Sequence, residues 1–202
     1  MKKNDIIALF TILRKANANP KSDLNYQDNF QLLVAVVLSA QATDVGVNRA
    51  TPGLFAAAAT PKAMVELGEE GIREYIRTIG LFNNKAKSIF GLSQMLLEKH
   101  DSKVPDNRQE LEAMPGVGQK TASVVLNVAF GQPTLAVDTH VQRVSNRLGL
   151  VKETNPAKTE KKLLAIIPPT FLQHAHHWLI LHGRYTCTAR SPKCGDCSII
   201  EW

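Results

Sequence analysis

The chain has 202 residues and a mass of 22.2 kDa, enough to bury a sizeable core in one large domain or in two small lobes. With 24 Lys and Arg against 18 Asp and Glu, its formal charge is +6, which favours a polyanionic partner without establishing one. The longest apolar run, at residues 32–38, is too short to span a bilayer, and the N-terminus does not resemble a secretory signal. We therefore expect a soluble cytoplasmic protein.

Helical periodicity runs through almost the whole chain and strand alternation is absent, so the sequence predicts an all-α fold. The first predicted helix has one apolar face, formed by Ile6, Leu9, Phe10 and Leu13. Residues 30–38 are apolar on all sides, which indicates a buried central helix, with Asp28 or Asn29 as its cap. Further helices are predicted over residues 44–56, 62–67, 69–78, 84–99, 107–113, 118–130, 139–148, 156–166 and 171–184.

Capping and breaking residues set several of these boundaries. Thr60 is a cap followed by the first-turn Pro61, and Asp106 is placed to cap residues 107–113. Pro52 falls inside 44–56, where its missing N–H should kink or end the helix. No low-complexity linker divides the chain, so we expect the lobes, residues 22–132 and residues 1–21 plus 133–202, to form by grouping of helices.

The segment LEAMPGVGQKTA, residues 111–122, joins a short helix to a longer one through Gly116, Val117 and Gly118. Its glycines permit positive φ and the close approach of a ligand, and the N-terminus of the next helix attracts an anion such as a DNA phosphate. Two glycines alone would fit an ordinary helical corner equally well. Together with the preceding proline and the following Lys120, they favour phosphate binding.

Two further motifs carry candidate functional groups. Asp138, in VDTHVQR at residues 137–143, precedes a predicted helix, where an aspartate is by itself more often only an N-cap. The three cysteines, Cys187, Cys194 and Cys197, form the pattern C-x6-C-x2-C. An odd, clustered set of thiols in a reducing compartment favours a metal site over disulfides.

Taken together, these motifs resemble the helix-hairpin-helix DNA glycosylase superfamily over almost the whole chain. The shared segments are residues 38–44, 78–81, 114–122, 136–140, 177–185 and the terminal cysteines. The resemblance implies a two-lobe base excision repair enzyme, a glycosylase and apurinic/apyrimidinic lyase. It also implies that the enzyme removes oxidised pyrimidines from double-stranded DNA bound in the cleft between the lobes. We expect a bacterial, cytoplasmic monomer that joins the nucleoid when it binds DNA.

The resemblance also assigns roles to single residues. Lys120 matches the catalytic lysine, which attacks C1′ of a flipped nucleotide and forms a Schiff base whose β-elimination cuts the strand 3′ to the lesion. Its first-turn position and partial burial should favour a neutral amine. Asp138 matches the essential aspartate, with His140 close by. Gln41 and Leu81 match residues that fill the gap left by the flipped base; without the resemblance they would be read as a helix cap and a core residue.

The cysteines match the first three ligands of the family's C-x6-C-x2-C-x5-C motif for a [4Fe–4S] cluster, and Trp202 precedes the position of the fourth. We expect a truncated chain; an incomplete cluster, zinc bound by three thiolates and a histidine, or no metal stay open. Arg184, Arg190 and Lys193 near the cysteines contact DNA phosphates in this interpretation, or form only a solvated loop. The histidines of the 171–184 helix lack a zinc-protease pattern and are expected in the core or on the surface.

Three other functions stay open. An adenine-specific mismatch glycosylase of the same superfamily typically lacks the catalytic lysine and has an additional C-terminal domain, so Lys120 and the short chain argue against it. A non-catalytic hairpin module would bind backbone phosphates without needing the carboxylate of Asp138. A structural metal-binding protein would account for the cysteines and leave the hairpin without explanation.

Overall fold

The computed structural model describes all residues from Met1 to Trp202 and contains helices and their connections, with no β-strand. This confirms the predicted all-α fold. No helix is both long enough and apolar enough to cross a membrane. The helices are α1 (Lys3–Ala16), α2 (Asn29–Ser39), α3 (Asp44–Ala57), α4 (Pro61–Tyr75), α5 (Phe82–Lys99), α6 (Arg108–Glu112), α7 (Gln119–Phe130), α8 (Thr139–Arg147), α9 (Pro156–Ile166), α10 (Pro169–Tyr185) and the 3-10 turn η1 (Cys194–Asp196).

Internal contacts divide the chain into two compact units. The middle unit comprises Asp23–Phe130 and contains α2 to α7. The terminal unit comprises Met1–Ser22 together with Gly131–Trp202 and contains α1, α8, α9 and α10. Each unit has its own cluster of buried apolar side chains, so each has the hydrophobic core that a compact body requires.

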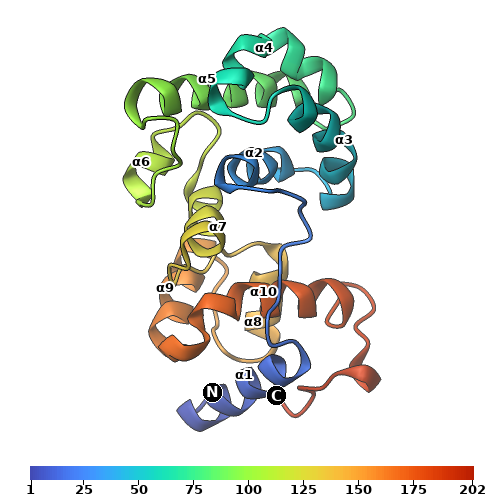
Figure 1. Ribbon diagram of the computed structural model, residues 1–202. Helices are drawn as coiled ribbons and strands as arrows, with labels where there is room; N and C mark the ends of the chain where they lie inside the picture. Colours follow the sequence, from blue (N-terminus) through green and yellow to red (C-terminus); the bar gives the residue numbers. More distant parts are fainter. The chain divides into compact units, whose positions relative to one another are not determined.

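Helix α2 forms the centre of the middle unit, as its uniform apolar composition predicts. Every residue from Leu32 to Leu38 is buried, and α3, α5 and α7 contact this helix. In Figure 1, α4 lies along α5 in the same unit. The carboxylate of Asp28 caps α2 by accepting a hydrogen bond from the N–H of Gln31 at 2.8 Å. A helix without a polar face is stable only when other elements cover it on all sides.

The helix predicted over residues 44–56 is confirmed as α3, and it does not end at Pro52 but continues to Ala57, with buried Val47 and Leu54 on either side of the proline. The packing of those side chains against α2 and α4 outweighs the one backbone hydrogen bond that the proline removes. One boundary prediction, the cap of α6, is wrong. This cap is Asn107, which accepts from the N–H of Glu110 at 2.9 Å, rather than Asp106.

Other boundaries are confirmed, including the cap at Thr60 and the first-turn proline at Pro61. The break predicted between residues 67 and 69 is also present, because Gly68 has φ 74° and ψ 165° inside α4. The second half of α4 ends at Tyr75, three residues before the predicted position. Helix α10 begins at Pro169, because a proline fits the first turn of a helix as readily as the linker predicted there.

In the terminal unit, α1 and α8 pack against the long helix α10 (Figure 1). The four apolar residues predicted for the first helix are all buried, and the ring of Phe10 lies 5.8 Å from that of Phe171. Gly183 allows α8 to approach α10 closely. A Cβ atom at this glycine would lie 2.9 Å from His140 Cβ and 3.0 Å from Val144 Cγ2, so any larger residue would force the two helices apart.

Candidate active site

The predicted hairpin connects α6 to α7 in the middle unit. Gly116 has φ +78°, and a Cβ atom there would lie 2.7 Å from Ser88 Cβ on α5, so both backbone conformation and space require glycine. Gly118 does not adopt the positive φ that a glycine permits. A Cβ atom at Gly118 would meet nothing within 4 Å, which leaves its backbone open to an approaching ligand. Val117, between them, is buried and anchors the turn.

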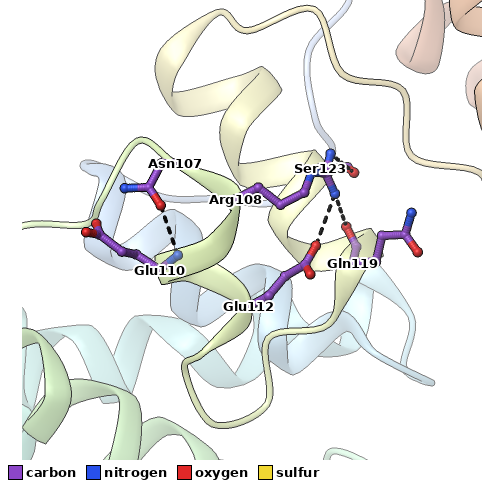
Figure 2. Close-up of polar contacts among 6 residues, drawn as sticks. All are labelled: Asn107, Arg108, Glu110, Glu112, Gln119 and Ser123. Atoms are coloured by element: carbon purple, nitrogen blue, oxygen red, sulfur yellow. Dashed lines mark hydrogen bonds and ion pairs between the residues drawn. The ribbon is translucent and has the colours of Figure 1, made fainter.

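Arg108 holds the two helices of the hairpin together, as Figure 2 shows. Its guanidinium donates to Glu112 Oε1 at 3.2 Å, to the carbonyl oxygen of Gln119 at 3.4 Å and to Ser123 Oγ at 2.9 Å. These bonds tie the first residues of α7 to α6. Arg108 was not among the predicted site residues, although its spacing of four residues from Glu112 predicts an ion pair on one helical face.

Lys120 is the second residue of α7, directly after the hairpin turn. Its side chain is exposed, so the expected partial burial is wrong. Gly118 and Gln119, which precede Lys120 in the hairpin turn, are exposed as well, so this part of the turn as a whole faces solvent. An exposed amine thus stands at the end of α7 where the first backbone N–H groups of a helix lack intrahelical acceptors.

Gln41 and Leu81 lie on neighbouring turns of the middle unit, one after α2 and one before α5. Both are exposed, Leu81 to 54%. Both have left-handed backbone conformations, with φ 53° and 60°, which are uncommon in residues with bulky side chains. A Cβ atom at Gly80 would lie 3.7 Å from the carbonyl oxygen of Gln41, so the two turns are adjacent.

Asp138 caps α8 in the terminal unit. Its Oδ1 accepts a hydrogen bond from the N–H of Val141 at 2.8 Å, and the side chain is partly exposed. The segment before it is held by His176, whose Nδ1 lies 2.8 Å from the carbonyl oxygen of Ala136. The predicted cap is therefore confirmed. His140 interacts with Arg143 of the same helix: its Nδ1 lies 3.3 Å from Nη2 of the arginine.

Two arginines of α8 fix the segment that carries the cysteines. Arg143 donates to the carbonyl oxygen of Cys187 at 3.1 Å. Arg147 donates to the carbonyl oxygens of Thr188 at 2.7 Å and Ala189 at 2.9 Å, and its Nη1 lies 3.5 Å from Cys187 Sγ. Neither arginine was among the predicted site residues, although their spacing of four residues places both on one face of α8. The helix that Asp138 begins is thus also the support of the cysteine segment.

Three of the four histidines of α10, His176, His177 and His182, are buried, in agreement with the predicted core or surface positions. Burial lowers the pKa of His177 to about 4, and the neighbouring His176 acts in the same direction. Burial also lowers the pKa of His182, whose Nε2 lies 3.7 Å from Cys197 Sγ. The His177 ring is consequently neutral near pH 7.

The three thiols are free, with Cys194 exposed and the other two partly buried. No group of three or more His, Cys, Asp or Glu side chains is gathered closely enough to hold a metal ion. The residues present therefore do not make up, as they are placed, the four-thiolate set of a [4Fe–4S] cluster. Of the cations in and beside this segment, Arg190 and Lys193 are exposed and Arg184 is partly buried.

The predicted site residues fall into two sets, one in each unit. In the middle unit, Gly116 of the hairpin lies close to α2 and α5, since a Cβ atom there would meet Ser88 Cβ at 2.7 Å and Val37 Cγ1 at 3.3 Å. The turns of Gln41 and Leu81 belong to the end of α2 and the start of α5. In the terminal unit, α8 links Asp138 to the cysteine segment. Lys120 belongs to the first set and Asp138 to the second.

Comparisons with known proteins find relatives along nearly the whole chain. Residues 34–169 match the family described as HhH-GPD superfamily base excision DNA repair protein, and residues 187–202 match the iron-sulfur binding domain of endonuclease III. Endonuclease III of Haemophilus influenzae is 54% identical over 199 residues, which cover 98% of this chain and 94% of the relative. That of Rickettsia conorii is 56% identical over 194 residues, covering 96% and 92%.

Solved structures similar to this chain are also those of DNA glycosylases. A trapped endonuclease III–DNA covalent intermediate, an estranged-adenine complex, matches with a TM-score of 0.92 and 42% identity over 100% of this chain and 95% of that one. A thermostable thymine-DNA glycosylase matches with a TM-score of 0.80 over 96% and 91%, and at 22% identity it shows the shared fold alone. The chain belongs to the endonuclease III family, within the HhH-GPD superfamily of base excision DNA repair proteins.

Proposed function

We propose that this chain removes damaged bases from duplex DNA and cleaves the strand at the resulting abasic site, as a bifunctional glycosylase and lyase. Membership of the endonuclease III family supports both activities, as does the relative trapped as a covalent intermediate with DNA. The observation that carries the proposal is an exposed Lys120 in the first turn of α7, next to the open backbone of Gly118. A nucleophilic amine and a phosphate-binding helix end then lie side by side.

Lys120 is the nucleophile in this proposal. Its unprotonated Nζ attacks C1′ of a nucleotide that has left the base stack, and the base departs with the electron pair of the C1′–N bond. Opening of the sugar ring converts the adduct into a Schiff base. Loss of a proton from C2′ then expels the 3′ phosphate by β-elimination, and water releases the lysine. Exposure suits this role, since the amine must reach a substrate that comes from solvent.

Asp138 stabilises the positive charge that develops on the sugar as the base departs, and it accepts and returns protons. The hydrogen bond from Val141 to Oδ1 fixes the orientation of the carboxylate. The only hydrogen bond to this carboxylate is that one, which leaves Oδ2 available for the sugar. His140 lies in the first turn of the same helix and helps to hold the DNA strand at this point.

The remaining site residues bind and distort the duplex. Gly116 and Gly118 present backbone N–H groups to a phosphate, and Val117, whose own N–H donates to the carbonyl oxygen of Met114 at 3.1 Å, shapes the turn between them. Gln41 and Leu81 occupy the gap left by the flipped nucleotide. The exposed cations Arg190 and Lys193, with Arg184, attract the phosphate backbone. We take oxidised pyrimidines as the substrates.

We further propose that Cys187, Cys194 and Cys197 are the ligands that this chain supplies to an iron–sulfur centre; a [4Fe–4S] cluster would need a fourth ligand besides these three thiolates. The match to the iron-sulfur binding domain of endonuclease III supports an iron–sulfur centre here. When bound, such a centre would act structurally and electrostatically, adding to the hold that Arg143 and Arg147 have on the segment carrying Arg190 and Lys193. No step of base removal or strand cleavage is assigned to it.

Borohydride trapping tests the function directly. Wild-type protein is incubated with a duplex that contains one oxidised pyrimidine, and borohydride is added to reduce the Schiff base to a stable adduct. We expect an adduct with wild type and with Lys62→Ala, which removes an exposed lysine of α4 in the same unit. Lys120→Ala should form no adduct while it still binds duplex DNA. If Lys120→Ala still cleaves abasic DNA, the proposed mechanism is wrong.

A second measurement tests the substrate class. Duplexes with an oxidised pyrimidine, with 8-oxoguanine and with an adenine–guanine mismatch are compared under single-turnover conditions. We expect the oxidised pyrimidine to be released fastest. Preferential release of adenine without a trapped adduct would instead indicate a monofunctional mismatch glycosylase.

A further inference from the structure

Lys85 is a buried cation in the first turn of α5. Its side chain is 6% exposed, and its ammonium donates one hydrogen bond, from Nζ to the carbonyl oxygen of Leu38 at 2.9 Å, 47 residues earlier in the chain. Burial lowers the pKa of Lys85 below its ordinary value, which reflects the cost of keeping a charge in this place. An apolar side chain of similar length would fill the same space without that cost, so packing alone does not account for a lysine.

The bond from Lys85 completes the C-terminal end of α2. A helix leaves its last four carbonyl groups without intrahelical donors. The carbonyl of Val36 accepts a hydrogen bond from the hydroxyl of Ser39, the last residue of α2, at 2.8 Å. The carbonyls of residues 37 and 39 accept from the backbone N–H groups of residues 40 and 42 in the turn that follows, at 3.4 and 3.1 Å. The carbonyl of Leu38 is the one whose donor comes from another helix. Because Leu38 is fully buried, its carbonyl would otherwise lack a partner.

The same lysine belongs to the turn that carries Leu81. Its backbone N–H donates to the carbonyl oxygen of Leu81 at 3.1 Å, and Leu81 is the N-cap residue of α5. Gln41 follows Leu38 by three residues. One side chain therefore spans the distance between two turns that each contain a left-handed, non-glycine residue. Such conformations are unfavourable and persist only where the surroundings enforce them.

We infer that Lys85 is a positioning residue for DNA distortion, which locks the turn of Gln41 against the turn of Leu81 and holds both side chains ready to enter the duplex. The inference rests on the roles proposed above for Gln41 and Leu81. Lys85 itself does not touch DNA, since it is buried. Without its hydrogen bond, the end of α2 relaxes until the carbonyl of Leu38 reaches water, and Gln41 leaves its left-handed conformation.

The test measures unstacking of the base opposite a lesion. Duplex DNA carries a tetrahydrofuran abasic analogue with 2-aminopurine opposite it, and fluorescence at saturating protein reports unstacking independently of affinity. Lys85→Met removes the donor with little change of size. We expect the fluorescence rise to shrink, and the single-turnover trapping rate on an oxidised pyrimidine to fall about tenfold, the factor that about 1.4 kcal/mol produces. The Kd for undamaged duplex should not change.

Two control variants separate positioning from loss of stability. Lys99→Met makes the same change of charge in the exposed last turn of α5, and Ile72→Val removes one methylene from the core of the same unit. Both should keep the fluorescence rise and the trapping rate. If Ile72→Val reproduces the defect of Lys85→Met, general instability explains it and the inference is wrong.

A second substitution covers the case in which Lys85→Met does not fold. Lys85→Gln keeps a polar head group but is one bond shorter, so it does not reach Leu38, and folding is checked by circular dichroism. It should show the same loss of fluorescence change. If folded Lys85→Gln or Lys85→Met gives the full 2-aminopurine fluorescence rise while wild type is still trapped on DNA, the inference about Lys85 is wrong and the proposed function stands. Absence of trapping by wild type overturns the proposed function and the inference with it.

Discussion

Replacement of Gly116 by alanine should destabilise the middle unit through two separate effects. The backbone φ of +78° is unfavourable for any residue with a Cβ atom, at a cost of about 1–2 kcal/mol. The new methyl group would also lie 2.7 Å from Ser88 Cβ and 3.3 Å from Val37 Cγ1, and relief of such overpacking costs roughly 1–3 kcal/mol. We expect Gly116→Ala to lower the free energy of unfolding by about 2–5 kcal/mol.

Urea unfolding followed by circular dichroism measures this loss. Gly118→Ala is the matched control, because its Cβ atom meets nothing within 4 Å, and it should change the free energy of unfolding by less than about 0.5 kcal/mol. A Ser88→Gly substitution separates the two effects. In that background Gly116→Ala should cost mainly the backbone part, about 1–2 kcal/mol, because only the longer contact of 3.3 Å with Val37 Cγ1 remains. A Gly116→Ala protein as stable as wild type would refute the reasoning.

Four further predictions concern the hairpin and the terminal unit. Gly118→Ala should weaken duplex binding in a salt titration even though stability is kept, and unchanged affinity would argue against backbone contact there. Asp138→Asn keeps the helix cap and should retain stability but lose glycosylase activity, whereas Asp138→Ala should also lose about 1 kcal/mol of stability in urea unfolding. Because the pKa of His177 falls from 6.5 to about 4 on folding, the unfolded chain takes up its proton first, so stability should rise with pH between these values. The free energy of unfolding, measured by urea titration at several pH values, should rise by at most about 1.4 kcal/mol per pH unit, and by less in His177→Gln. Arg147→Met should speed trypsin cleavage after the exposed Arg190, measured by mass spectrometry, and an unchanged rate would show that the arginine does not hold the segment.

Features that depend on near neighbours in the chain could be predicted from the sequence. The caps at Asp28, Thr60 and Asp138 each accept a hydrogen bond from an N–H three residues later, so residue type and position were sufficient. The glycine turn was located for the same reason, although only Gly116 has the positive φ. The buried centre at α2 followed from composition, since a helix without a polar face has to be covered.

Features that depend on distant parts of the chain could not be predicted in this way. The course of α3 through Pro52 is decided by packing, and a Cβ atom at the adjacent Gly53 would lie 3.2 Å from the ring of Tyr75 on α4. The partner of Lys85 is 47 residues away and the nearest carbonyl partner of Arg147 is 41 residues away. Helical spacing did place Lys85 on the same face as Ile89 and Leu92, which was a signal of its burial.

The assembly of the terminal unit from both ends of the chain has a consequence for folding during synthesis. The apolar face of α1 is made early, but its partners are made last: Phe10 packs against Phe171, and the indole N–H of Trp178 donates to the carbonyl oxygen of Asn17, 161 residues earlier. At roughly 5–20 residues per second, about 10–30 seconds separate these events on the ribosome. The middle unit is contiguous and is complete before then. For this interval the apolar face of the nascent α1 lacks the residues of α10 against which it packs in the folded unit.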